Sequence, residues 1–350
     1  MTDRTDDPTT PIQYSVLVSC YFEEKSIDEF HARLSATLKA SGRRCEMIFV
    51  NDGSTDRTFE RLEAIFDADP DVSAVFDLFG NVGQPNAKTP AVICARGRAM
   101  VHLDSDLQLA PEELPTLMER YEEGFDIVSG YRQQRQDPVS RTLPSRLANV
   151  LMRAASGSRV RDFGCTFKVY DGRLVRGFDF GRFRPWRMLP VVAAANRLIE
   201  VPVSHRERKY GKSGWTFRKL FSHNMESIVN LSTEPFQLLA ILCLAAAALF
   251  ALRIALGWLL RFSILSTVTN GLILNAMALG FLVMLAVLAA IGEFTIRNFV
   301  VLQRRPAFVI REFRMRRPRT PELMSALGLD DAAIHGDARP ARGDAPVRAG

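Results

Sequence analysis

A cluster of oxygen-bearing side chains follows a short apolar run near residue 100. Asp104, Asp106 and Gln108 stand at every second position of the stretch HLDSDLQ. In extended backbone, alternate side chains point to the same side, so these three can face one ligand together. Carboxylate and amide oxygens suit Mg²⁺ or Mn²⁺, and such an ion can bridge a diphosphate and stabilise its departure as a leaving group. The alternative is an acidic turn that caps the helix beginning at Pro111.

Two further acidic segments also follow apolar runs. They are YFEE at 21–24 and NDGSTD at 51–56. Taken singly, each is equally compatible with ordinary turn chemistry or with acids at the start of a helix. Three acidic strand ends in one parallel sheet would instead form a pocket for a nucleotide and a metal ion.

The elements that must position these segments alternate along the chain. Short apolar runs predict strands, and apolar residues that recur every three to four positions predict helices between them. Such alternation is typical of an α/β domain, whose mostly parallel sheet is covered on both faces and binds ligands beyond the carboxyl ends of its strands. We expect strands at 14–20, 45–50, 73–79 and 100–103, and helices at 27–40 and from the turn at 51–54 to residue 66.

Charge and hydropathy divide the 350 residues into unlike parts. Hydrophobic residues make up 47% and charged residues 24%, which excludes wholesale disorder. Residues 236–292 carry only Arg253 and Arg261 as charges, and Arg- and Lys-rich stretches flank them at 206–219 and 293–319. This pattern predicts two membrane-spanning helices with both basic flanks in the cytoplasm, and it argues against nucleic acid as the partner of the net +6 charge. A pair of helices buried in a soluble domain is the alternative.

The five cysteines are scattered and odd in number, which argues against a disulfide or zinc framework and fits a reducing compartment. The helix before the spans has one apolar face beside basic residues, which indicates either an interfacial amphipathic helix or a core helix of the α/β domain. We therefore expect a disordered leader at 1–13, an α/β domain at 14–215, an interfacial helix at 216–234, two spans at about 236–260 and 268–292 within 235–293, a basic juxtamembrane segment at 294–317 and a disordered tail at 318–350.

Taken together, the motifs resemble the family 2 glycosyltransferases, specifically their membrane-anchored polyisoprenyl-phosphate branch. The resemblance runs from about Tyr14 to Phe313, and its carriers are SVLVSCYFEEKSI, FVNDGSTDRT, NVGQ, HLDSDLQLAPEEL, GYRQQRQD, RDFGCTFKVY, HRERKYGKS and RRPAFVIREF. It implies a GT-A fold and a homo-oligomer at the bacterial inner membrane, with the catalytic domain and both termini cytoplasmic. The implied reaction is inverting, metal-dependent transfer of a sugar from a nucleotide donor, UDP by preference, to undecaprenyl or another polyisoprenyl phosphate, for cell-envelope glycan or lipid A modification.

The resemblance also implies roles for particular residues. Asp162 is expected near the reacting centre, where it orients the acceptor, because a phosphate oxygen that is already anionic needs little deprotonation. The alternative for Asp162 is a loop-fixing salt bridge to Arg161 or Lys168, while Cys165 is expected to be a packing residue. The implied residues are Asp104, Asp106 and Gln108 for Mg²⁺ or Mn²⁺; Tyr21, Glu23, Asp52, Gln84 and Asp104 for the nucleotide; Arg132, Arg141 and Ser145 for the acceptor phosphate; and Asp162 with Arg208 for catalysis.

Several positions depart from the family's pattern. The usual Pro and Asn at the first strand end are Ser19 and Phe22, the usual first Asp of the second cluster is Asn51, and an expected lysine is Gly214. These departures bear on which donor sugar is used more than on the class of reaction, because Asp104, Asp106 and Gln108 are all present. One alternative is a processive polysaccharide synthase, but the sequence lacks a Gln-x-x-Arg-Trp motif and has few predicted spans. Another is a non-catalytic membrane scaffold, but Asp104, Asp106 and Gln108 are all present.

Overall fold

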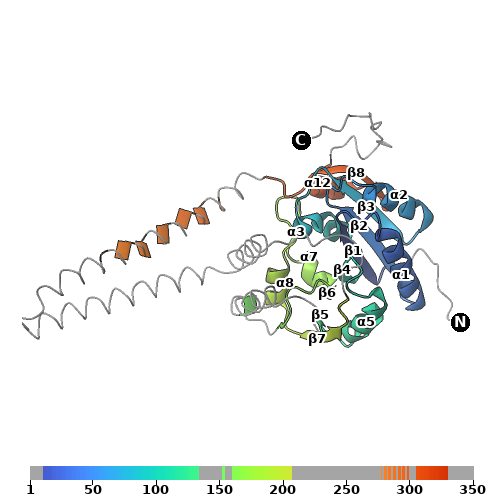
Figure 1. Cartoon of the computed structure of the whole chain (residues 1–350), viewed down its shortest axis with the longest axis horizontal. Coiled ribbons are helices and arrows are strands. Elements are labelled where there is room, and N and C mark those ends of the chain that lie inside the picture. The colour runs from blue at the N-terminus through green and yellow to red at the C-terminus, as the bar shows by residue number, and fades with distance from the viewer. Residues whose placement is uncertain are drawn as a thin grey trace, which may run out of the picture. The chain divides into compact units, whose positions relative to one another are not determined.

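We describe a computed structural model of the chain for residues 11–133, 160–206 and 305–329, with residues 152–153 and scattered helical positions between 277 and 298 (Figure 1). The chain separates into two compact units, one formed by Met1–Asn224 with Pro306–Gly350 and the other by Met225–Arg305. In the described part of the chain, no helix has the length and apolar character needed to span a membrane. The expected interfacial helix and first span lie outside the described residues, as do most residues of the second span.

One eight-stranded sheet forms the centre of the first unit in its described residues, in the order β7-β5-β6-β4-β1-β2-β3-β8. Strands β1 to β4, β5 and β7 run in one direction, while β6 and β8 run antiparallel to their neighbours. The carboxyl ends of six strands therefore lie along one edge. The strands are β1 (Tyr14–Cys20), β2 (Cys45–Asn51), β3 (Val72–Leu78), β4 (Ala99–Asp104), β5 (Ile127–Arg132), β6 (Lys168–Asp171), β7 (Leu198–Val203) and β8 (Ile310–Met315).

The helices cover both faces of this sheet (Figure 1). On one face, α1 buries Ile27, Phe30, Leu34 and Leu38, which recur at helical spacing, and it packs beside α2 and α5. Truncating one of these side chains, such as Leu34, to Ala would cost about 2–5 kcal/mol. The helices are α1 (Ile27–Ala40), α2 (Thr58–Ala68), α3 (Gln84–Ala87), α4 (Thr89–Cys94), η1 (Pro111–Glu113), α5 (Leu114–Glu122), α7 (Gly172–Arg176), α8 (Met188–Ala194) and α12 (Pro321–Leu327).

The predicted elements of the first hundred residues are confirmed to within two residues, apart from the start of α2, which begins at Thr58. Their sequences show why: β1 to β3 are buried almost throughout, and such strands are continuous apolar runs. The α/β class with a mostly parallel sheet is confirmed as well.

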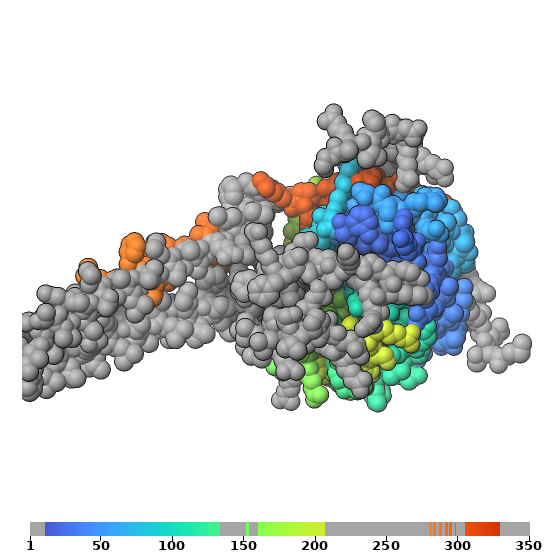
Figure 2. All heavy atoms as spheres, viewed as in Figure 1, coloured from blue at the N-terminus to red at the C-terminus, as the bar shows by residue number. Residues whose placement is uncertain are grey.

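The C-terminal part of the chain requires a correction. Residues 310–315, expected in a basic juxtamembrane segment, form β8 and pair antiparallel with β3, while part of the expected disordered tail forms α12. The segment is held because Phe308 and Ile310 are buried beside the sheet, and α12 buries Leu323, Met324 and Leu327. In the space-filling view, the red end of this segment lies against the blue, amino-terminal half of the domain (Figure 2).

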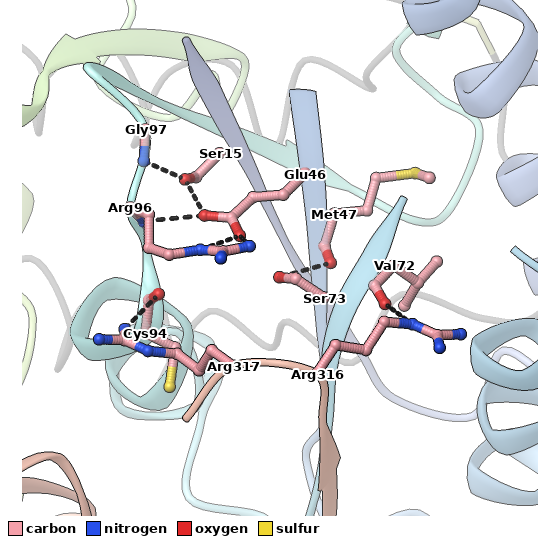
Figure 3. Close-up of polar contacts among 10 residues, drawn as sticks. All are labelled: Ser15, Glu46, Met47, Val72, Ser73, Cys94, Arg96, Gly97, Arg316 and Arg317. Carbon is pink, nitrogen blue, oxygen red and sulfur yellow. Dashed lines mark hydrogen bonds and ion pairs between the residues drawn. The ribbon is translucent and has the colours of Figure 1, made fainter. Parts of the chain in front are cut away.

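Two arginines at the end of β8 fix this segment to the amino-terminal edge of the sheet (Figure 3). Arg316 Nε donates to the carbonyl oxygen of Val72 at 3.1 Å, and Arg317 Nη1 donates to that of Cys94 at 2.9 Å. Nearby, the buried Glu46 accepts hydrogen bonds from Ser15 Oγ at 2.6 Å and from the Arg96 guanidinium at 2.7 Å. These contacts hold the loop before β4 and leave the opposite edge of the sheet to the acidic segments.

Candidate active site

Asp52, just beyond β2, binds the loop that follows β3. Its carboxylate accepts hydrogen bonds from the backbone N–H groups of Val82 at 2.8 Å and Gly83 at 3.1 Å, and from Asn81 Nδ2 at 3.0 Å. Asp52 is 3% exposed, and burial raises the pKa of its carboxyl to about 6, although the hydrogen bonds from Val82 and Gly83 lower it. The Asp52 carboxylate therefore couples two loops at the carboxyl edge of the sheet.

Gly53 allows this close approach. Its backbone has a φ of +68°, and a Cβ atom at this position would lie 2.3 Å from the carbonyl carbon of Gly80. Any side chain would therefore force the two loops apart, which explains glycine in this turn.

Asp104, at the end of β4, is surrounded by three donors, two from the stretch at α3 and one from the loop before β6. One carboxylate oxygen accepts from Gln84 Nε2 and lies 3.4 Å from Lys88 Nζ, and the other accepts from Thr166 Oγ1 at 2.7 Å. The structure thus brings together Asp104 and Gln84, both expected at the nucleotide. Lys88 and Thr166 were not expected there; the signal for Lys88 is that it is the one charged residue between Gly83 and Arg96.

The residues after Asp104 do not continue as extended backbone. β4 ends at Asp104, and Leu107 has a φ of +59°, so the expected alternation of Asp104, Asp106 and Gln108 along a strand is wrong. Asp104 ends the strand, while Asp106 and Gln108 lie on the bend that follows, in which the Gln108 N–H donates to Asp106 Oδ1 at 3.1 Å. Among the described residues, no group of three or more His, Cys, Asp or Glu side chains is placed to hold a metal ion.

The loop after β1 presents aromatic side chains. Tyr21 and Phe22 are 45% and 49% exposed, with ring centroids 4.5 Å apart in an edge-to-face arrangement. Phe22 has a φ of +57°, a conformation that Asn adopts far more readily than Phe, which accounts for the family's usual Asn at this position. The loop is attached to the β2 loop and to the start of α2, because Phe22 N–H donates to Ser54 Oγ at 3.0 Å and Glu23 N–H to Thr58 Oγ1 at 2.9 Å.

Asp162 and Arg132 form a nearly buried ion pair. Arg132 Nε and Nη2 donate to the two carboxylate oxygens at 2.8 and 3.0 Å, and the side chains of Arg132 and Asp162 are 17% and 8% exposed. Arg161, considered above as a partner of Asp162, instead lies 3.8 Å from Glu200. The structure therefore joins a residue expected at the reacting centre to one expected at the acceptor phosphate.

Cys165 is a packing residue, as expected, because it is fully buried and burial raises the pKa of its thiol. The remaining expected site residues, Arg141, Ser145 and Arg208, lie outside the described residues, as does Gly214.

Comparison with known proteins identifies the class. Residues 15–181 match the model for glycosyl transferase family 2, and the chain belongs to this family. It is therefore a glycosyltransferase, and the expected GT-A domain is confirmed by the family and the sheet.

Particular relatives narrow the class. The chain is 32% identical over 325 residues to undecaprenyl-phosphate 4-deoxy-4-formamido-L-arabinose transferase of Pseudomonas aeruginosa (strain LESB58), covering 89% of this chain and 93% of the relative. It is 34% identical over 254 residues to the enzyme of the same name from Pectobacterium carotovorum subsp. carotovorum (strain PC1), covering 69% and 77%. The motifs quoted above resemble the same enzyme.

Among solved structures, a mannosyltransferase from Pyrobaculum calidifontis in complex with GDP-Man and Mn²⁺ is 18% identical, with a TM-score of 0.42 over 79% of this chain and 88% of that chain.

Proposed function

We propose that the chain transfers a sugar from a nucleotide donor, UDP by preference, to undecaprenyl phosphate or another polyisoprenyl phosphate. The main support is that this chain is similar to 93% of the length of a transferase whose name includes undecaprenyl phosphate. The acidic loops of this chain also meet at one edge of the sheet. The proposal places the domain at the cytoplasmic face of a membrane, held by the expected spans at 236–260 and 268–292.

On the donor side, the nucleotide would lie against the loops of Asp52 and Tyr21, with its diphosphate near Asp104. The residues at the turn fit a hard divalent cation, because Asp104, Asp106 and Gln108 offer only oxygen ligands. Mg²⁺ or Mn²⁺, held chiefly by Asp106 and Gln108, would supply charge stabilisation for the departing diphosphate. Asp104 already accepts hydrogen bonds from Gln84, Lys88 and Thr166, so it is better suited to orienting the donor than to binding the metal ion.

On the acceptor side, the lipid phosphate would be bound by Arg132, whose planar guanidinium can hold two phosphate oxygens. A phosphate oxygen attacks the anomeric carbon as the bond to the nucleoside diphosphate breaks, so the configuration inverts in one displacement. The attacking oxygen is anionic at neutral pH, and Asp162 would position it through Arg132 rather than remove a proton.

A transfer assay tests this proposal. Membranes containing the chain are incubated with undecaprenyl phosphate and a panel of labelled UDP- and GDP-sugars, with and without Mg²⁺ or Mn²⁺. We expect metal-dependent, lipid-soluble label that falls at least about a hundredfold in Asp106→Ala. The control is Asp28→Ala, which removes an exposed carboxylate that pairs with Arg61 on the surface.

Three outcomes contradict parts of the proposal. Full transfer by Asp106→Ala would remove the metal assignment, and failure of the folded wild-type chain to bind or transfer any donor would favour a scaffold role. Label in long polymers rather than in a lipid-soluble product would favour a processive synthase.

A further inference from the structure

A chain of hydrogen bonds links β8, which follows the expected membrane spans, to the loops expected at the donor nucleotide. Arg311 Nη1 on β8 donates to Asp77 Oδ2 on β3 at 3.2 Å. The other oxygen of Asp77 accepts from Asn51 Nδ2 on β2 at 2.7 Å. Asn51 Oδ1 accepts in turn from Ser54 Oγ, whose oxygen accepts the Phe22 N–H at 3.0 Å. Neighbouring strands and their loops are thus joined from the sheet edge to β1.

The middle of this chain of hydrogen bonds is buried, so losing any one contact would leave a buried polar group without its partner. Asn51 is 0% exposed and Asp77 is 2% exposed, whereas the Arg311 side chain is 43% exposed. A buried carboxylate is costly unless a cation or hydrogen-bond donors compensate its charge, and Arg311 and Asn51 both do so for Asp77. Arg311 is itself oriented, because Nη2 donates to the Phe79 carbonyl oxygen at 2.7 Å and the guanidinium lies 5.4 Å from the Phe79 ring centroid.

Asn51 is matched to Asp77. Its amide group can donate to one partner and accept from another, which a carboxylate at the same place cannot do. An Asp at this position would bring two carboxylates to the 2.7 Å that now separates Asn51 Nδ2 from Asp77 Oδ1. Asn51 is therefore complementary to the acid on the neighbouring strand.

We propose that Arg311 is a positioning residue for the donor nucleotide, acting through Asp77, Asn51 and Ser54 on the loops at 21–24 and 51–56. This inference rests on the proposed function, which places the nucleotide at these loops. β8 is then a part of the donor site contributed by the chain after the spans. Arg316 fixes the other end of this strand to Val72, so its register against β3 is held at both ends.

The matched control lies on the same strand. Arg314 pairs instead with the exposed Asp67 at 2.6 Å, and its guanidinium lies 4.9 Å from the Phe66 ring centroid. Using the full-length protein in detergent with the donor that the panel identifies, we expect Arg311→Ala to raise the donor KM about tenfold with kcat within about threefold. Arg314→Ala should change the donor KM less than twofold. Equal donor KM values in the two variants would overturn the inference.

A charge exchange tests the relay itself and covers the case that Arg311→Ala folds poorly. Asn51→Asp should weaken UDP binding, measured by calorimetry, because two carboxylates then meet. The double variant Asn51→Asp with Asp77→Asn should restore most of that affinity, since the amide introduced on β3 can donate to the carboxylate introduced on β2. Absence of this rescue in folded protein would refute the relay.

Hydrogen exchange of the ligand-free protein separates this inference from the proposed function. Arg311→Ala should speed exchange of the Phe22 amide relative to Arg314→Ala, whatever the reaction is. If the wild type transfers sugar but neither exchange nor donor KM responds to Arg311→Ala, the inference fails and the function stands. If the wild type transfers nothing while exchange responds as expected, the function fails and the relay stands.

Discussion

The ion pair between Arg132 and Asp162 allows stability and chemistry to be separated in one residue. Asp162→Asn keeps the shape of the side chain but removes the charge opposite a guanidinium that is 17% exposed. Breaking a buried pair costs about 3–5 kcal/mol, and partial solvation of Arg132 places this case near the lower value. At about 2–4 °C per kcal/mol for a domain of this size, the melting temperature should fall by about 6–12 °C.

The activity of the same variant tests the mechanism. If Asp162 acted as an indispensable general base, its loss would reduce kcat by about 10²–10⁴. Because we infer that it positions Arg132 and the acceptor, transfer by Asp162→Asn below its melting temperature should fall by less than about a hundredfold. An unchanged melting temperature would refute the structural reasoning, and complete inactivity in folded protein would refute the mechanistic reasoning.

A double-mutant cycle checks that the two effects arise from the pair. Thermal melts of wild type, Arg132→Ala, Asp162→Asn and the double variant in detergent are compared. We expect the double variant to be less destabilised than the sum of the single variants, by about 2–3 kcal/mol, since both remove the same interaction. Additive effects would contradict the contact described here.

The other predictions concern the donor side and the core. Gly53→Ala should abolish donor binding and clearly lower the melting temperature, because its Cβ would meet the Gly80 backbone at 2.3 Å; unchanged binding in a calorimetric titration would contradict this. Asp52 should make donor KM rise as pH falls through about 6, since a protonated carboxyl cannot accept all its hydrogen bonds, and Asp52→Asn should show a high KM at every pH. The same raised pKa means that the folded chain holds this proton more tightly than the unfolded chain, so Asp52 should reduce unfolding free energy by up to about 3 kcal/mol as pH rises from 4 to 6, compared with Asp52→Asn in denaturant titrations. His102→Phe should raise the melting temperature, because His102 Nε2 is buried without a hydrogen-bond partner among the described residues while its ring packs 4.6 Å from Trp186; a lower melting temperature would refute this reasoning.

The central strands could be predicted because burial on both faces requires continuous apolar runs in the sequence. β8 could not, since an edge strand that contains Arg311 and Arg314 has the same composition as the basic flank of a membrane span. α12 is short and lies in a stretch rich in Arg and Pro, and what stabilises it is packing against α4, which local pattern does not reveal.

The candidate site was predictable where a motif is local and hidden where contacts are distant. Asp52 and Asp104 could be predicted because they stand at the ends of apolar strands. The pairing of Arg132 with Asp162 depends instead on how β5 meets the loop before β6. The contact of Arg311 with Asp77 joins residues 234 positions apart, and no spacing rule relates them. Lys88 left a weak signal as an isolated charge, but its partner Asp104 became evident only in the fold.

Mass spectrometry of the lipid product tests the central claim most directly. Membranes containing the chain are supplied with undecaprenyl phosphate, the panel of nucleotide sugars and Mg²⁺ or Mn²⁺, and the lipid extract is analysed beside one from Asp106→Ala. We predict one new species whose mass equals the lipid phosphate plus a single sugar residue, absent from the variant. A ladder of several sugars, or an extract identical to that of the variant while donor is consumed, would contradict the account.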